Sequence, residues 1–75
     1  MPPEPDALDA FRRQLADRIR DHRLWRNLSQ EQVAERTGLS AHTVQRIESG
    51  TRETKVSYLF RLAHALDCEV RDLLP

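Results

Sequence analysis

The chain has 75 residues, 39% hydrophobic and 32% charged, and its 12 basic and 12 acidic side chains give a formal net charge of zero. This composition predicts one small globular domain that oligomerisation would help to stabilise, and a content of only two glycines argues against an all-β fold. One cysteine excludes an internal disulfide and a cysteine-rich zinc module, and no apolar run is long enough to cross a membrane.

Charge is unevenly distributed along the chain. The net charge is −1 over residues 1–22, +3 over residues 23–61 and −2 over residues 62–75. The basic middle segment is typical either of a surface that attracts a polyanion or of a merely solvated one. The opening residues, MPPEPDA, lack the basic start and apolar stretch of a signal peptide, so we expect a cytoplasmic protein.

The first predicted element is a long amphipathic helix. Residues 1–6 are proline-rich and predict a flexible tail, whereas residues 7–75 predict a single domain. Asp6 is a suitable N-cap, and the helix is expected to reach about Arg26. Apolar residues recur on one face at spacings of three and four: Leu8, Phe11, Leu15 and Ile19.

The next segment, LSQEQVAERTGLSAHTV, begins a helix twice. Ser29 and Ser40 are strong N-cap residues, each preceded by a leucine and followed four positions later by a valine. These leucine–valine pairs are hydrophobic staples, and Gln32 completes a capping box with Ser29. Gly38 supplies the left-handed backbone that ends the first of the two helices. Two short helices joined by so tight a turn cross steeply, which is the helix-turn-helix arrangement.

Two further helices are predicted after this pair. Residues 55–67, KVSYLFRLAHALD, are apolar on most sides, so we expect this helix to lie in the middle of the core. A short last helix over about residues 70–74 presents three apolar side chains for packing or for contact with a second chain: Val70, Leu73 and Leu74. The predicted fold class is therefore all-α.

The segments LSQEQVAERTGLSAHTVQRIESGTRE and LFRLAHALDCEVRDLL resemble the lambda-repressor-like, or Xre/Cro-type, DNA-binding domains of bacterial and phage regulators. The resemblance covers about residues 15–74. Its markers are Gln30, Ala34, Gly38, Val44, Ile47, Glu48 and Gly50. It implies five helices, with the helix-turn-helix at the second and third and the third helix laid in the DNA major groove. The chain departs from the family at Thr54 and Lys55, where a proline and a small capping residue are common, and at Asp67, often a glycine.

The third helix is the candidate reading element. If Val44 and Ile47 face the core, helix geometry points three polar side chains outward, with a fourth on the flank: His42, Arg46, Ser49 and Gln45. The resemblance implies base-reading positions at Ala41, His42, Gln45 and Arg46. Arginine can pair with guanine through two hydrogen bonds, glutamine suits adenine and histidine can donate to a purine acceptor. The expected partner is therefore double-stranded DNA.

Four residues are predicted to contact DNA phosphates: Gln30, Thr43, Arg52 and Lys55. Gln30 starts a helix, where free backbone N–H groups favour an anion, and the resemblance places its side chain on the DNA backbone. The other three flank the recognition helix. The family departures in the loop GTRETK leave open which of Thr51, Arg52 and Lys55 meets a phosphate.

Glu48 is predicted to be at least partly buried, because it lies close to the face of Val44 and Ile47, and a buried carboxylate needs a partner. The resemblance implies a structural ion pair between Glu48 and Arg23. Periodicity alone places His22 nearer the apolar stripe of the first helix, so His22 is the rival partner. A guanidinium is favoured because it can satisfy a carboxylate through two hydrogen bonds.

Other chemistries have weaker support in the sequence. His64 and Cys68 have a spacing that suits two metal ligands, but only His22 and His42 are available to complete a site and His42 points outward, so we expect no metal. No catalytic motif occurs, and we expect neither enzymatic activity nor a cofactor. Trp25, beside Leu24 and Leu28, is expected to pack in the core.

The sequence therefore predicts a sequence-specific transcriptional regulator, a repressor or controller, that binds a palindromic operator as a homodimer. The predicted dimer contact is the last helix, at Val70, Leu73 and Leu74. One alternative is an antitoxin with a toxin partner. Another is a protein-interaction module that uses the same fold and leaves the recognition helix idle, although such a module would more often expose aromatic anchors on that helix.

Overall fold

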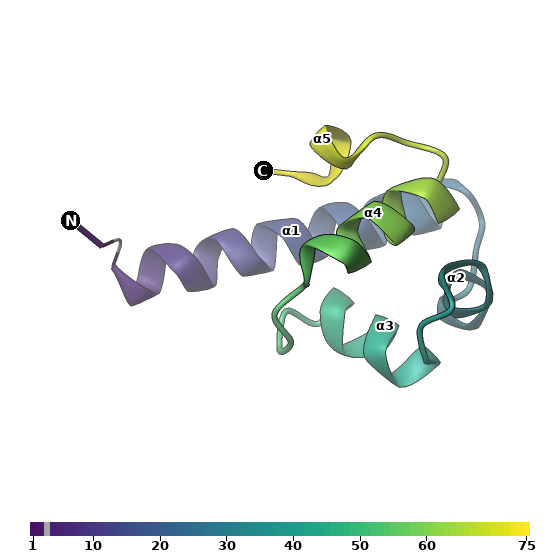
Figure 1. Ribbon diagram of the computed structural model, residues 1–75, viewed down its shortest axis with the longest axis horizontal. Helices are drawn as coiled ribbons and strands as arrows, with labels where there is room; N and C mark the ends of the chain where they lie inside the picture. The colour runs from purple at the N-terminus through teal and green to yellow at the C-terminus, as the bar shows by residue number, and fades with distance from the viewer. Residues whose placement is uncertain (3) are drawn as a thin grey trace.

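The computed structural model describes residues 1–2 and 4–75, and this part of the chain forms five helices without a strand (Figure 1). In chain order they are α1 (Pro5–Trp25), α2 (Gln30–Thr37), α3 (Ala41–Glu48), α4 (Val56–Ala65) and α5 (Val70–Leu73). The all-α fold with a helix-turn-helix formed by the second and third helices is confirmed. None of these helices is both long and apolar enough to span a membrane.

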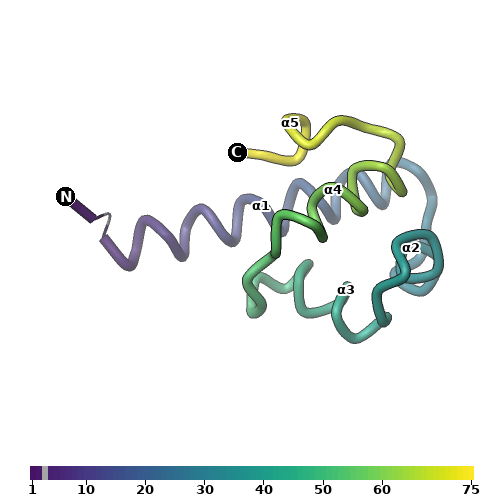
Figure 2. The backbone as a smooth tube through the Cα atoms, in the orientation of Figure 1, coloured from purple at the N-terminus to yellow at the C-terminus, as the bar shows by residue number. Residues whose placement is uncertain are grey.

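Helix α1 begins earlier than the sequence analysis predicted. Its N-cap is Glu4, and Asp6 lies inside the first turn, so the prediction of Asp6 as N-cap was wrong. Pro5 explains the earlier start, because proline has a preset φ and its missing N–H has no partner at a first helical position. The predicted tail thus loses Pro5 and Asp6 to the helix, and Pro3 lies outside the described residues. Figure 2 shows the N-terminal half of α1 extending beyond the other helices.

Local hydrogen bonds fix both helices of the helix-turn-helix. The Ser29 Oγ accepts a hydrogen bond of 3.0 Å from the Gln32 N–H, and the Gln32 Oε1 accepts one of 2.8 Å from the Ser29 N–H. The Ser40 Oγ accepts a 3.0 Å hydrogen bond from the Thr43 N–H. Gly38 ends α2 with a φ of 77°, a left-handed conformation that favours glycine. The predicted caps, capping box and helix end are confirmed.

One hydrophobic core joins all five helices. Its fully buried large side chains come from each of them: Ile19, Val33, Val44, Ile47, Leu62, Leu66 and Leu73. Helix α4 packs against α2 and α5, while α1 packs against α3 and α5. The short α2 and α3 therefore rest on the two longer helices, which fixes the orientation of α3.

Three predictions about apolar side chains were wrong. Trp25 is 83% exposed and lies edge-on to the His22 ring at a centroid distance of 5.9 Å, because it sits on the outer face at the end of α1. Helix α4 is not buried on most sides, since Val56 and Phe60 are 83% and 70% exposed. Leu73 points into the core of its own chain and is fully buried, so it is not available for a dimer contact. Periodicity could not tell which of these faces another helix covers.

Candidate nucleic-acid interface

The outer face of α3 carries exposed polar side chains above a buried apolar face. Val44 and Ile47 are buried, whereas the predicted base-reading residues all lie on the exposed side: Ala41, His42, Gln45 and Arg46. The helix is capped at its start by Ser40 and at its end by the hydroxyl of Ser49, which donates to the Arg46 carbonyl at 3.0 Å. The exposed polar face of α3 therefore lies on a helix whose two ends are both fixed by hydrogen bonds.

Glu48 anchors α3 to α1. This carboxylate is 4% exposed and accepts hydrogen bonds from Arg23, at 2.7 Å from Nε to Oε2 and at 2.9 Å from Nη2 to Oε1. The same guanidinium donates from Nη1 to the Leu28 carbonyl at 2.8 Å. The Arg23–Glu48 pair is confirmed, and His22, the rival partner, lies against Trp25 instead. Because the pair is buried and bidentate, it fixes the recognition helix rather than binding a ligand.

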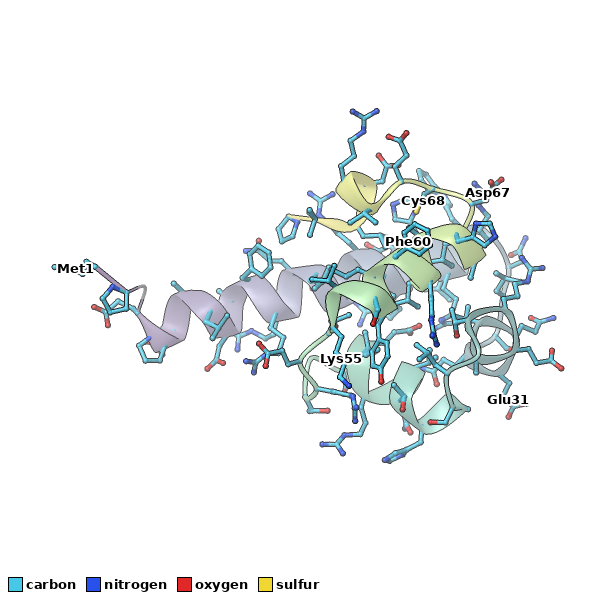
Figure 3. All side chains as sticks on the ribbon, in the orientation of Figure 1. Met1, Glu31, Lys55, Phe60, Asp67 and Cys68 are labelled. Carbon is cyan, nitrogen blue, oxygen red and sulfur yellow. The ribbon has the colours of Figure 1, made fainter. Side chains whose placement is uncertain are left out.

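The four predicted phosphate-binding residues differ in how their side chains are engaged. The Gln30 Nε2 donates to the Glu48 Oε1 at 3.3 Å, and the Thr43 Oγ1 accepts from the Ser40 Oγ at 2.9 Å. Both side chains are half-buried and take part in the internal hydrogen bonds that hold α2 and α3. Arg52 and Lys55 belong instead to the segment between α3 and α4. Figure 3 shows Lys55 reaching from this segment toward the side of the molecule where α3 lies.

Three basic residues on α3 and in the segment that follows it form no ion pair among the described residues. In the described part of the chain, the ion pairs join Arg12 to Asp9, Arg20 to Asp17, Arg23 to Glu48, Arg26 to Asp67 and Arg71 to Glu69. None of these pairs involves Arg46, Arg52 or Lys55. Arg12, Arg20 and Arg23 of α1 and Arg71 of α5 are thus paired internally, whereas the three cations on and beside α3 remain available to an external anion.

Sequence reasoning missed one residue at this site, Tyr58. The Lys55 Nζ lies 5.3 Å from the centroid of the Tyr58 ring, and the Arg52 Cζ lies 6.0 Å from it. An aromatic residue three positions after a lysine at a helix start was the available signal, because residues three apart share a helix face. The ring brings the two cations of the α3–α4 segment together.

The sequence analysis considered His64 and Cys68 as possible metal ligands. In the residues that the structure describes, no three His, Cys, Asp or Glu side chains form a group suited to a metal ion. His64 is exposed and Cys68 is half-buried against the core. Burial raises the pKa of the Cys68 thiol above 9.0, with a further increase from Asp72 and Asp67 that Arg26 opposes. Cys68 is therefore a packing residue of the α4–α5 junction.

Comparison with known proteins places this arrangement in a family. The helix-turn-helix family model HTH_3 matches residues 19–73. The control protein C.SmaI of Serratia marcescens is 42% identical over 60 residues, which cover 80% of this chain and 71% of that protein. An uncharacterised HTH-type transcriptional regulator, y4wC of Sinorhizobium fredii, is 33% identical over 88% of this chain, which spans 44% of that longer protein.

Solved structures show the same fold. The restriction-modification controller protein C.AhdI of Aeromonas hydrophila superposes with a TM-score of 0.85 at 35% identity, over 87% of this chain and 98% of that one. The DNA-binding domain of BldD superposes with a TM-score of 0.81 at 30% identity, over 89% of this chain and 97% of that one. The chain belongs to the HTH_3 helix-turn-helix family. It is a transcriptional regulator with a helix-turn-helix DNA-binding fold, and the relatives named here are regulators rather than enzymes.

Proposed function

We propose that the protein is a controller or repressor that reads a specific DNA sequence by inserting α3 into the major groove. The observation that carries this proposal is the exposed face of α3, whose polar side chains lie on a helix fixed at both ends. Arg46 suits a guanine, Gln45 an adenine and His42 a purine acceptor, while Ala41 is small enough to approach a thymine methyl group.

Contacts to phosphates would set the register of α3 in the groove. The unpaired cations Arg52 and Lys55 flank the helix on one side, and Gln30 and Thr43 lie at the starts of α2 and α3. Helix starts present free backbone N–H groups, so these two residues can approach phosphates without carrying charge. Because α1 holds α3 through Glu48, phosphate contacts on either side would act on one rigid unit.

The proposed functional unit is a homodimer on a palindromic operator. One recognition helix covers only a few base pairs, so a second copy one DNA turn away, about 34 Å, would supply the remaining specificity. With Leu73 buried, the predicted contact at Val70 and Leu74 is revised to include the exposed apolar face of α4. Val56 and Phe60 lie one turn apart on that face and are the apolar side chains of α4 most open to a partner.

Selection of bound fragments from random DNA tests this function. The purified protein and its Arg46→Ala variant would each be used at a salt concentration of about 150 mM, near physiological ionic strength. We expect a palindromic motif that the wild-type protein enriches and the variant does not. Enrichment without a motif, equal in both proteins, would contradict sequence-specific reading and favour an interaction module with a protein partner.

A further inference from the structure

Two cationic side chains converge on the ring of Tyr58. The Lys55 Nζ and the Arg52 Cζ lie 5.3 Å and 6.0 Å from its centroid, within the range of a cation–π interaction. Lys55 comes directly before α4, Tyr58 lies in the first turn of this helix, and Arg52 lies in the preceding segment. A single aromatic ring therefore restrains both free cations of the α3–α4 segment.

The ring itself is held firmly. Tyr58 is half-buried and packs against the hydrophobic core. The N–H groups of Tyr58 and Leu59 each donate to the Lys55 carbonyl at 3.0 Å, which fixes the backbone that joins the ring to the lysine. Since α4 also packs against α2, the ring keeps a set position relative to the helix-turn-helix.

This arrangement has an electrostatic cost for the protein without a ligand. Two positive charges gathered at one ring repel each other, and neither forms an ion pair with a carboxylate among the described residues. Lys55 also occupies the N-cap of α4, where its side chain provides no capping hydrogen bond and its charge opposes the helix dipole. The cation–π interactions with the ring offset part of these costs, and an external anion that meets the two cations would offset more.

We propose that Tyr58 is a positioning residue for DNA phosphate binding, whose ring orders Arg52 and Lys55 before the protein meets DNA. The proposal rests on the DNA-binding function proposed above. Long basic side chains lose rotamer freedom when they grip a phosphate, and ordering them beforehand reduces that loss. Tyr58 thus strengthens binding without touching DNA, and its effect depends on the two cations.

A mutant cycle tests this dependence. Affinity for a random-sequence duplex of about 30 base pairs, which spans nearly three DNA turns and whose binding depends mainly on phosphate contacts, would be measured for Tyr58→Ala and Tyr58→Phe. We expect about fivefold weaker binding for Tyr58→Ala and a change of less than about twofold for Tyr58→Phe, which keeps the ring. In the Arg52→Ala/Lys55→Ala background, Tyr58→Ala should change the affinity by less than about twofold. An equal loss in both backgrounds would overturn the proposal.

A matched control separates positioning from folding. Leu59 is the next residue of α4 and also packs against the core, but it has no aromatic ring to hold the two cations. Leu59→Ala should lower thermal stability at least as much as Tyr58→Ala, yet leave the affinity of the folded protein unchanged. A loss of affinity in Leu59→Ala as large as that in Tyr58→Ala would also overturn the proposal.

The mutant cycle and the selection experiment can fail independently of each other. If the selection yields no motif but the mutant cycle shows dependence on the cations, specific reading by α3 fails while the role of Tyr58 stands. If a motif is found and lost in Arg46→Ala, but Tyr58→Ala acts equally in both backgrounds, only the role of Tyr58 fails. Lys55 methylene protons shifted upfield by the ring in wild type and Tyr58→Phe, and not in Tyr58→Ala, would support the positioning directly.

Discussion

The carboxylate of Glu48 connects α3 to a part of the chain that lies 25 residues earlier in sequence. Arg23 reaches it from α1 through two hydrogen bonds and also binds the Leu28 carbonyl in the α1–α2 loop. A planar guanidinium with fixed donor directions restrains both the distance and the orientation of its acceptors. The residue that sets the angle of α3 is therefore buried, and its hydrogen-bond partners come from α1 and from Gln30 at the start of α2.

Removal of one partner of the Arg23–Glu48 pair should lower the free energy of unfolding. Arg23→Met leaves a carboxylate that is 4% exposed without its cationic partner, and we expect a loss of about 3–5 kcal/mol in the free energy of unfolding, measured by urea denaturation. The double variant Arg23→Met/Glu48→Met removes both charges and should recover most of this loss. Losses that simply add in the double variant would show that the two residues act independently.

Cys68 gives a pH-dependent prediction. Burial raises the pKa of its thiol above the ordinary 9.0, so the folded chain holds less thiolate than the unfolded chain at the same pH. We expect iodoacetamide to alkylate the folded protein more slowly than the urea-unfolded protein at pH 8. As the pH rises, the thiol of the unfolded chain ionises first. The difference in thiol pKa therefore stabilises the folded chain below pH 9, and this stabilisation is lost as the pH rises through the pKa of the folded thiol. The Cys68→Ser variant should not show this loss of stability at high pH. Equal alkylation rates for the folded and the urea-unfolded protein would contradict the prediction.

At the scale of the element, α3 has only eight residues and depends on its caps. A helix this short has little intrinsic stability, so its start is decided by the hydrogen bond from the Thr43 N–H to the Ser40 Oγ and by packing. The Ser40 Oγ also donates to Thr43 Oγ1, which holds the first turn of the recognition helix. The exposed Ser40 hydroxyl therefore stabilises α3 and, in the proposed function, also helps to hold the helix that meets DNA.

Substitution of Ser40 should separate these two roles. Ser40→Ala removes the cap and is expected to cost about 1 kcal/mol of unfolding free energy. Ser40→Asp restores an N-cap acceptor and should return stability to within about 0.5 kcal/mol of wild type, because aspartate caps as well as serine. It also places a negative charge at the start of α3, so DNA binding should weaken even though the fold is stable. Wild-type affinity in Ser40→Asp, measured by fluorescence anisotropy, would place the start of α3 away from phosphates.

Local signals in the sequence were enough to predict the helix-turn-helix. Capping involves residues within four positions of each other, so Ser29 with Gln32, Gly38 and Ser40 could be interpreted without knowledge of the fold. The predicted start of α1 was wrong because Pro5 and Asp6 are both acceptable near a helix N-terminus. Neighbouring residues alone do not decide between them.

Tertiary contacts were harder to predict. Periodicity identifies an apolar stripe but not what covers it, so Trp25 and Phe60 were assigned to a core that they do not reach. It also left His22 and Arg23 as rival partners of Glu48, and only the resemblance and the donor geometry favoured the arginine. Tyr58 escaped notice because its proposed role depends on Arg52 and Lys55, whose positions are set by the segment between α3 and α4.

At the scale of the whole molecule, a net charge of zero conceals a division between faces. Two arginines of α1, Arg12 and Arg20, and the one in α5 are paired with acidic residues nearby in sequence, whereas Arg46, Arg52 and Lys55 have no carboxylate partner among the described residues. Formal charge is therefore a poor guide to the partner of a small domain. What matters is which unpaired charges the fold brings together, and one such group, Arg46, Arg52 and Lys55, lies on and beside α3.

The proposed dimer makes the exposed face of α4 essential to operator binding. Phe60 is 70% exposed, so Phe60→Asp should leave the free energy of unfolding of a monomer nearly unchanged, while a buried carboxylate at the dimer contact would favour dissociation. Sedimentation velocity should then show a monomer, with operator affinity reduced about 100-fold because the two half-sites are no longer bound together. Trp25→Asp is the matched control, since Trp25 is 83% exposed but lies at the end of α1, and it should remain dimeric. A dimeric Phe60→Asp protein would move the interface to another surface.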